Sequence, residues 1–444
     1  MAGEAPDPTL PCRKTKMRIT IADLRARLSP ARLGDAPVGP GLDERGPYEA
    51  DADRILFSAP FRLLADKTQV HGPSGNALTR SRLTHSLEVS RVARTLGNRF
   101  ASLLPGEDAR REDVGDVLAA AGLLHDVGNP PFGHTGEDVA SEFFQHHPLG
   151  RQLVEALPAR VRTQFRAVEG NAQALRIATR LAGWRPSGGL CLTAATIAAF
   201  CKYPWTADAA PASKRKFGVY AADLPALAWA MEQTRTPRRG QGFARHPLAY
   251  LSEAADDICY HVVDVEDAAQ IGVITLAEAE ELLLPLVPDR QGLGHADTAL
   301  RRLAFLRSRA IATLIDAVAE ILPSEVEDLM TGDAPGDLVA RTRFGAHLAA
   351  IKAFSKHYIY GNANRRLQDQ NAKGYITFLL ERTSEALLAR ERLGAPVRDP
   401  AIAAMGDRKI PYDREGWIHA MLDHLTDQTD RSIVALVASL RAET

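Results

Sequence analysis

A helix that ends in a His-Asp pair is predicted by residues 112–131, which read EDVGDVLAAAGLLHDVGNPP. Apolar residues recur there at steps of three and four, the spacing that gathers side chains on one face of a helix. They are Val114, Val117, Leu118, Ala121 and Leu124. His125 continues this face, so its ring is expected to point inward, and the glycine and prolines that follow end the helix. A buried His-Asp pair is costly unless something satisfies it, and a metal ion would do so.

The rest of the chain has the same helical character. Helical spacing recurs at about 83–104, 162–183, 189–201, 222–234 and 248–270 and again beyond residue 299, whereas strand patterns are nearly absent. The sequence therefore predicts an all-α fold. We expect three parts: a mobile or draped N-terminal arm over residues 1–50 with a short helix near 21–27, a core over 51–280, and a helical C-terminal portion over 281–444.

Composition narrows the class of protein. The 444 residues carry 54 Lys and Arg against 55 Asp and Glu, a net charge of −1, which argues against a polycationic nucleic-acid coat and an acidic tail protein. With 45% hydrophobic and 25% charged residues, the chain is typical of a soluble globular protein with a large core. The basic stretch 235–247, RTPRRGQGFARHP, is either a DNA contact or an ordinary surface loop.

The cysteines and the apolar runs indicate a cytoplasmic protein. Four cysteines are present, Cys12, Cys191, Cys201 and Cys259, and no two have CxxC spacing, which argues against a zinc knuckle or a thioredoxin-type site. A reducing compartment fits this pattern best. The N-terminal residues lack the apolar core of a signal peptide, and the longest apolar runs are far too short to cross a bilayer. We expect no membrane association.

A second inward histidine lies in RLTHSLEV, residues 82–89. His85 precedes Val89, Val92 and Leu96 by four, seven and eleven residues, so it shares their helix face. Arg82 lies three residues earlier and therefore on the same side.

Two further groups of polar residues have helical spacing. His134 and Glu137 are three residues apart, so one helical turn places both on one side, the arrangement of a general acid/base histidine with a carboxylate partner. Asp256, Tyr260 and Asp264 step by four along a stripe separate from the apolar face of their stretch. Three polar groups in that register can line a cleft together.

Each of these residues alone has an ordinary structural explanation, such as a satisfied core histidine or a solvated carboxylate. Together, two inward histidines, the aspartate after one of them and a later helical aspartate supply nitrogen and oxygen donors for one ion. This donor set suits Mn, Fe, Co, Ni, Zn or Mg. Four protein ligands leave positions on an octahedral ion for water or a substrate oxygen.

Six motifs in order resemble the deoxyguanosinetriphosphate triphosphohydrolase family of the HD-domain metal-dependent phosphohydrolases. They are FRLLADKTQV (61–70), RLTHSLEV (82–89), HDVGNPPFGHTGE (125–137), EGNAQ (169–173), KYPW (202–205) and EAADDICY (253–260). The resemblance runs from about residue 54 to 267, roughly half the chain. An isolated His-Asp pair is a weak signal, but these motifs in this order are highly specific.

The resemblance implies an all-α HD-domain fold and a metal held by His85, His125, Asp126 and Asp256, with Mn or Mg expected. The implied reaction is hydrolysis of a deoxynucleoside triphosphate, dGTP or another dNTP, to deoxynucleoside and tripolyphosphate. Family members often form homo-oligomers, hexamers among them, and some respond to a second nucleotide or to single-stranded DNA.

The resemblance also assigns roles to individual positions. His134 matches the catalytic histidine and Glu137 its partner. The positions expected to bind substrate are Gln69, Arg82, Asn171, Lys202, Tyr260 and Asp264. The assignment of Arg82 is based on its position beside His85, and the other assignments are based on the motifs.

The chain departs from the family pattern in places. The family usually reads FRRL where this chain has FRLL, so Leu63 removes one positive charge. The C-terminal third matches less clearly; its basic and aromatic stretch 356–366 either reaches a phosphate or forms a solvated helix face. Two alternatives to the triphosphohydrolase stay open: an HD-type nucleotidase or phosphodiesterase, and a nucleotide-sensing protein with little turnover.

Overall fold

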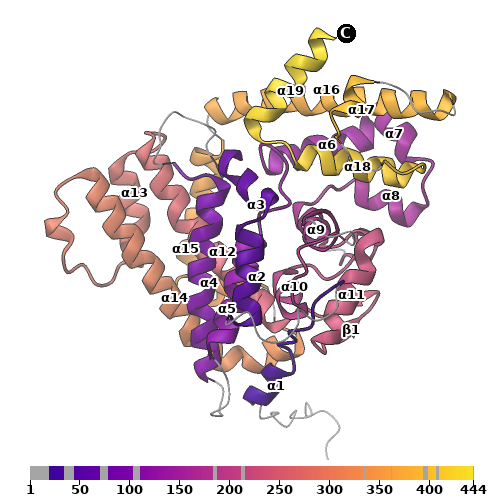
Figure 1. The fold of residues 1–444 in the computed structure, drawn as a ribbon. Helices are drawn as coiled ribbons and strands as arrows, with labels where there is room; N and C mark the ends of the chain where they lie inside the picture. The colour runs from indigo at the N-terminus through magenta and orange to yellow at the C-terminus, as the bar shows by residue number, and fades with distance from the viewer. Residues whose placement is uncertain are drawn as a thin grey trace, which may run out of the picture.

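The computed structural model describes residues 20–34, 45–70, 79–103, 111–183, 188–211, 216–334, 336–361, 363–393, 399–406 and 410–443. Across these residues the chain is mostly helical, and its strands amount to one two-stranded antiparallel pair (Figure 1). The predicted all-α fold is confirmed. Among the same residues, no helix combines the length and apolarity needed to cross a membrane.

The helices are joined by connections of very different lengths, from one residue between α6 and α7 to the segment between Phe200 and Leu224. Those in the first half are α1 (Ile21–Arg25), α2 (Pro47–Leu56), α3 (Ala59–Leu63), α4 (Arg82–Leu103), α5 (Arg111–Leu124), α6 (His134–His146), α7 (Pro148–Val154), α8 (Ala159–Phe165), α9 (Gly170–Arg176), α10 (Ala194–Phe200) and α11 (Leu224–Gln233). The remaining elements are β1 (Arg238–Arg239), β2 (Gly242–Phe243), α12 (Pro247–Gln270), α13 (Leu276–Leu283), α14 (Ala299–Thr331), α15 (Gly345–Phe354), α16 (Ala363–Leu393), α17 (Pro400–Ala403), α18 (Arg414–Thr426) and α19 (Asp430–Ala442).

The larger hydrophobic core is built on α4, α5 and α12. Helix α4 packs along α5, and α12 contacts both of them as well as α14. The predicted apolar faces point into this core, because Val89, Leu96, Val117 and Leu118 are all buried. The core therefore holds the start of α4, the end of α5 and the middle of α12 in fixed relative positions.

A second hydrophobic cluster joins the middle of the chain to its end. Residues of α6, α7 and α8, such as Phe144 and Phe165, pack with residues of α16, α18 and α19, such as Leu387 and Ile418. Figure 1 shows α16 to α19 lying beside α6, α7 and α8. Meanwhile α14 and α15 belong to the first cluster. Each cluster therefore joins segments that are distant in sequence.

Part of the predicted arm lies outside the described residues, and the described part packs on the core. The helix expected near residue 21 is α1, and Leu24 within it is buried. Arg32 binds the carboxylate of Asp51 and donates to the carbonyl oxygen of Cys191 at 2.7 Å. These contacts attach residues 20–34 to α2 and to the segment before α10.

The basic stretch 235–247 forms the β1–β2 hairpin, and three of its arginines are ion-paired. Arg238 lies 2.7 Å from Glu232, and Arg239 lies 2.5 Å from Asp333. Arg245 is buried and lies 2.7 Å from Glu253. These carboxylates offset the positive charge that suggested a DNA contact.

Candidate active site

A polar cavity of about 270 Å³ opens where α4, α5, α6, α9 and α12 meet. Its walls carry mostly charged and hydrogen-bonding side chains. They are Gln69, Val70, Arg82, His85, His125, Asp126, Asn129, His134, Glu137, Glu169, Asn171, Lys202, Tyr203, Lys216, Asp256, Asp257, Tyr260 and Lys352. The cavity contains every predicted metal-ligand, catalytic and substrate-binding residue except Asp264.

Three of the predicted metal ligands form a compact cluster. One donor atom from each of His85, His125 and Asp256 lies within 4.8 Å of the others. Nε2 of His85 is 3.2 Å from Oδ1 of Asp256, and Nε2 of His125 is 3.6 Å from the same oxygen. Both imidazoles are buried, where a polar atom without a partner is costly.

The hydrogen bonding of His125 leaves a lone pair free for a metal. Its Nδ1 lies 2.7 Å from the carbonyl oxygen of Gly122, which can only accept, so Nδ1 carries the proton and Nε2 does not. Nε2 of His125 and Oδ2 of Asp126 are buried, lie 3.5 Å apart and have no hydrogen-bond partner. Burial also lowers the pKa of His125, which favours the neutral ring that a metal requires. The donor set therefore fits a divalent cation.

Asp126 lies beside the cluster and is held from the other side. Its Oδ1 accepts a hydrogen bond from Asn129 at 2.5 Å and lies 2.7 Å from Arg82. Burial raises the pKa of Asp126, but Arg82, His125 and His85 together lower it to about 2. Asp126 is therefore ionised and directs its second oxygen toward His125.

Lys202, predicted to bind substrate, contacts a predicted metal ligand. Its Nζ donates to Oδ2 of Asp256 at 2.7 Å. Burial raises the pKa of Asp256, yet Lys202 and the two histidines hold it well below the usual range. Lys202 thus orients Asp256 so that Oδ1 faces the histidines.

His134 and Glu137 form the predicted pair at the start of α6. Nδ1 of His134 lies 2.5 Å from Oε2 of Glu137, while Oε1 of Glu137 accepts from the backbone nitrogen of Gly170 at 2.6 Å. The hydrogen bond to Glu137 and its charge raise the pKa of His134. The imidazole is 71% exposed, so its second nitrogen is open to a ligand in the cavity.

The backbone before His134 takes an uncommon path. Phe132 has φ of 62° and Gly133 has φ of 60°, so both adopt positive φ, which is rare for a phenylalanine. A side chain at Gly133 would also collide with Arg82, since a Cβ there would lie 2.3 Å from Nη2. The backbone of the Gly-Pro-rich motif therefore passes close to Arg82, and this path places His134 at the cavity.

The predicted substrate-binding residues divide into two groups. Gln69, Arg82, Asn171 and Tyr260 line the cavity together with Lys202, and the Oε1 atom of Gln69 is buried without a hydrogen-bond partner. Asp264 lies outside the lining. It is buried, and one of its oxygens accepts from the hydroxyl of Tyr360 at 2.6 Å. The four-residue step placed Asp264 on the stripe of Tyr260 but could not show that Tyr360 covers it.

Sequence reasoning missed several residues of the lining. Lys216 comes from the segment before α11, and Lys352 comes from α15, in the part of the chain with the weaker family resemblance. Among the described residues, neither lysine lies within ion-pair distance of a carboxylate. Lys216 ends the basic run Lys214-Arg215-Lys216, a local signal that was not used, whereas Lys352 is an isolated lysine in an otherwise apolar stretch. Glu169 and Tyr203 stand inside the quoted motifs and gave a signal that was not used.

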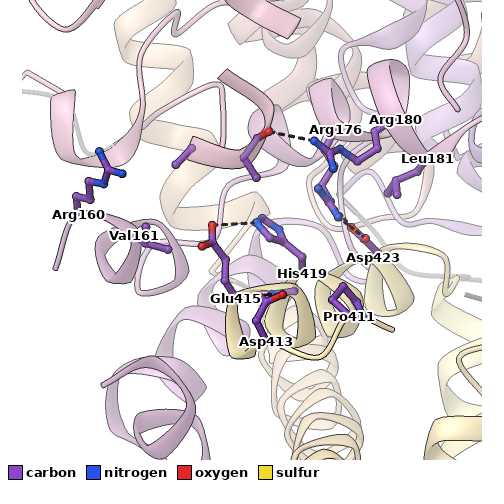
Figure 2. Close-up of a pocket in the computed structure, with 14 residues that line it drawn as sticks. Arg160, Val161, Arg176, Arg180, Leu181, Pro411, Asp413, Glu415, His419 and Asp423 are labelled. Carbon is purple, nitrogen blue, oxygen red and sulfur yellow. Dashed lines mark hydrogen bonds and ion pairs between the residues drawn. The ribbon is translucent and has the colours of Figure 1, made fainter. Parts of the chain in front are cut away.

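A larger cavity of about 700 Å³ lies between α8, α9 and α18 (Figure 2). Its most buried charges are neutralised by the protein. Arg176 donates to Asp423 through two nitrogens at 2.8 and 3.0 Å, and Arg180 lies 2.8 Å from Asp223. The metal-ligand cluster found among the described residues lies elsewhere. We therefore place the chemistry in the smaller cavity.

Comparisons with known proteins bear on this geometry. The HD domain family matches residues 82–223, which include His85, His125, Asp126 and His134 but not Asp256. Over 373 residues the chain is 39% identical to a deoxyguanosinetriphosphate triphosphohydrolase-like protein of Pseudomonas aeruginosa, with 81% of this chain and 84% of that protein covered. Proteins of the same name from Synechocystis sp. and Corynebacterium efficiens are 36% and 34% identical, with 76% and 73% of this chain and 80% and 70% of those proteins covered.

Proposed function

Because this chain belongs to the deoxyguanosinetriphosphate triphosphohydrolase-like HD-domain family, it is a metal-dependent phosphohydrolase, and we propose that its substrate is a deoxynucleoside triphosphate. The proposed products are a deoxynucleoside and tripolyphosphate, with dGTP or another dNTP as substrate. The observation that carries this proposal is the meeting of two groups in one cavity: the cluster of His85, His125 and Asp256, and the pair of His134 and Glu137.

The metal site is proposed to comprise His85, His125, Asp126 and Asp256. A bound divalent ion polarises a phosphate oxygen and lowers the pKa of a bound water. We propose Mn or Mg; Co, Fe, Ni and Zn suit the same mixture of nitrogen and oxygen donors. The orphaned Nε2 of His125 and Oδ2 of Asp126 support this assignment, because buried polar atoms without partners are rare.

Two lysines of the cavity can bind the charged end of the substrate. Arg82 and Lys202 pair directly with Asp126 and Asp256, whereas no carboxylate of the described residues lies within ion-pair distance of Lys216 or Lys352. Burial lowers the pKa of Lys216, but the more distant charges of Glu169 and Glu137 raise it, so Lys216 is a cation. Ammonium groups without a carboxylate partner can take the oxygens of a polyphosphate. This leaves Gln69, whose amide oxygen lacks a partner, with Asn171 and Tyr260 to contact the sugar and base.

His134 is proposed to donate a proton to the leaving 5′ oxygen. Glu137 holds Nδ1, so the proton is transferred from Nε2, which faces away from Glu137. The carboxylate favours the protonated ring, as a general acid requires. Gly170 fixes the other oxygen of Glu137 and so holds the pair in one orientation.

A product assay tests the proposal. The purified protein is incubated with each of the four dNTPs, and separately GTP, with Mn or Mg, and the products are resolved by chromatography. Deoxynucleoside with tripolyphosphate is the expected result. Nucleoside mono- or diphosphate would instead move the protein to another class of hydrolase. Binding without turnover, even with nucleotide mixtures or single-stranded DNA as activators, would indicate a sensor.

A matched variant separates chemistry from binding in this assay. His134→Ala is expected to keep its bound metal and to lose turnover by roughly 10²–10⁴-fold, the contribution of a general acid. Unchanged turnover would remove His134 from the mechanism. Light scattering on the same preparations tests the proposed homo-oligomer.

A further inference from the structure

The first residue of α19 joins two segments of the active site. Asp430 is buried, and its Oδ1 accepts from the backbone nitrogen of Phe132 at 2.8 Å. Its Oδ2 accepts from the backbone nitrogen of Thr68 at 3.0 Å and from the hydroxyl of that threonine. One carboxylate near the C-terminus thus contacts the segments that lead to Gln69 and to His134.

A buried lysine makes a second tie between the same parts. Nζ of Lys67 donates to the carbonyl oxygen of Asn129 at 2.7 Å and to that of Thr426, the last residue of α18, at 2.6 Å. Lys67 is 1% exposed. The loop of residues 129–132 is therefore attached at both ends to the corner between α18 and α19.

This loop needs such an anchor because of its backbone conformation. Phe132 and Gly133 both have positive φ, and α6 begins with His134 directly after them. A phenylalanine keeps positive φ only where surrounding contacts impose it. The Asp430 carboxylate accepts from the amide of that same phenylalanine, so it acts on the residue whose conformation sets the direction of α6.

We propose that Asp430 is a positioning residue, which orients His134 by holding the positive-φ turn at Phe132. The proposal rests on the proposed role of His134 as proton donor. The C-terminal helices then have a function beyond packing: the α18–α19 corner completes an active site whose other residues lie before position 353.

The experiment compares Asp430→Ala with a control elsewhere on the same helices. Asp413 caps α18 by accepting from the backbone nitrogen of Gly416 at 2.8 Å and lies outside the polar cavity, so Asp413→Ala removes a cap without touching the loop. Both proteins are studied at full length at a temperature where circular dichroism shows them folded. Asp430→Asn, which keeps the shape and one acceptor, replaces Asp430→Ala if the latter does not fold.

Three readouts distinguish positioning from general loosening. In Asp430→Ala, amide hydrogen exchange over residues 129–136 should be faster than in the wild type. The kcat should fall by roughly 10–10²-fold because the reacting group is displaced. The Mn²⁺ affinity should stay within about twofold of the wild-type value. Asp413→Ala should leave exchange at 129–136 and kcat unchanged. Turnover in Asp430→Ala equal to that of Asp413→Ala, or unaltered exchange at 129–136, would overturn the proposal.

The same data separate this inference from the proposed function. A wild-type protein that releases no tripolyphosphate contradicts the proposed function. The kcat comparison is then made with whichever nucleotide it hydrolyses, and exchange is read as before. If residues 129–136 exchange their amide hydrogens faster in Asp430→Ala than in the wild type, the positioning role is supported. If their exchange is the same in both proteins, that role is overturned.

Discussion

Gly128 offers a sharp test of how closely the active-site elements are packed. It follows the His125-Asp126 turn, and a Cβ placed on it would lie 2.1 Å from the carbonyl oxygen of Gly170 and 2.2 Å from the backbone nitrogen of Ala174. Both neighbours are backbone atoms of α9, so no side chain can rotate away. Because real Cβ contacts essentially never fall under 3.0 Å, Gly128→Ala requires a displacement of about 0.9 Å.

That displacement must reach the site whichever element moves. If α9 moves, it carries the backbone nitrogen of Gly170, which holds Glu137 at 2.6 Å, and Asn171, which lines the cavity. If the turn moves instead, it carries Asp126. A displacement near 1 Å costs catalysis roughly 10²-fold, and overpacking costs about 1–3 kcal/mol of stability.

The assay measures kcat for the substrate found by product analysis and the free energy of unfolding in urea. Gly294→Ala is the control, because a Cβ there meets nothing within 4 Å. We expect the control to resemble wild type and Gly128→Ala to lose both turnover and stability. Wild-type turnover and stability in Gly128→Ala would refute the reasoning, since they would show that α9 can withdraw without affecting the cavity.

Three further variants test separate parts of the site. His125→Ala should abolish Mn²⁺ binding in a calorimetric titration together with activity, and full turnover would refute the metal assignment. Glu137→Gln removes the carboxylate that raises the pKa of His134, so the ring should lose its proton at a lower pH. The decline of kcat at high pH should therefore begin at a lower pH than in the wild type, and an unchanged decline would contradict the general-acid role. Asp423→Ala leaves the buried guanidinium of Arg176 without its main carboxylate partner, so the free energy of unfolding should fall by about 3–5 kcal/mol. A fall of less than about 1 kcal/mol, measured by unfolding in urea, would show that Asp223 is a sufficient partner.

Helical periodicity predicted the orientation of several residues that line the polar cavity. His85 and His125 were predicted to point inward from the apolar residues that share their faces, and both rings are buried beside Asp256. The three-residue step between His134 and Glu137 likewise predicted a contact, which the structure places at 2.5 Å. These predictions succeed because positions three and four residues apart on a helix share a side whatever the rest of the chain does.

Contacts between distant segments could not be predicted in this way. Lys202 was expected to bind substrate, and its contact with Asp256, 54 residues away, was not predicted. Tyr360 covers Asp264 from 96 residues away, and Asp430 reaches Phe132 across 298 residues. Such pairings depend on how helices pack, and packing is set by many side chains together rather than by a local spacing.

The sequence by itself determined the helical class and the inward faces, since each is encoded within one or two helical turns, and its motifs supplied the residues for which we propose catalytic and binding roles. The tertiary structure decided which charged side chains form ion pairs with one another and which can bind a ligand. Arg82 pairs with Asp126 and Lys202 with Asp256, while Lys216 and Lys352 line the cavity with no carboxylate of the described residues at ion-pair distance. It also brought the α18–α19 corner to the loop before His134. The physical reason is range: helix faces follow from local backbone geometry, whereas ion pairing and loop anchoring follow from the assembled core.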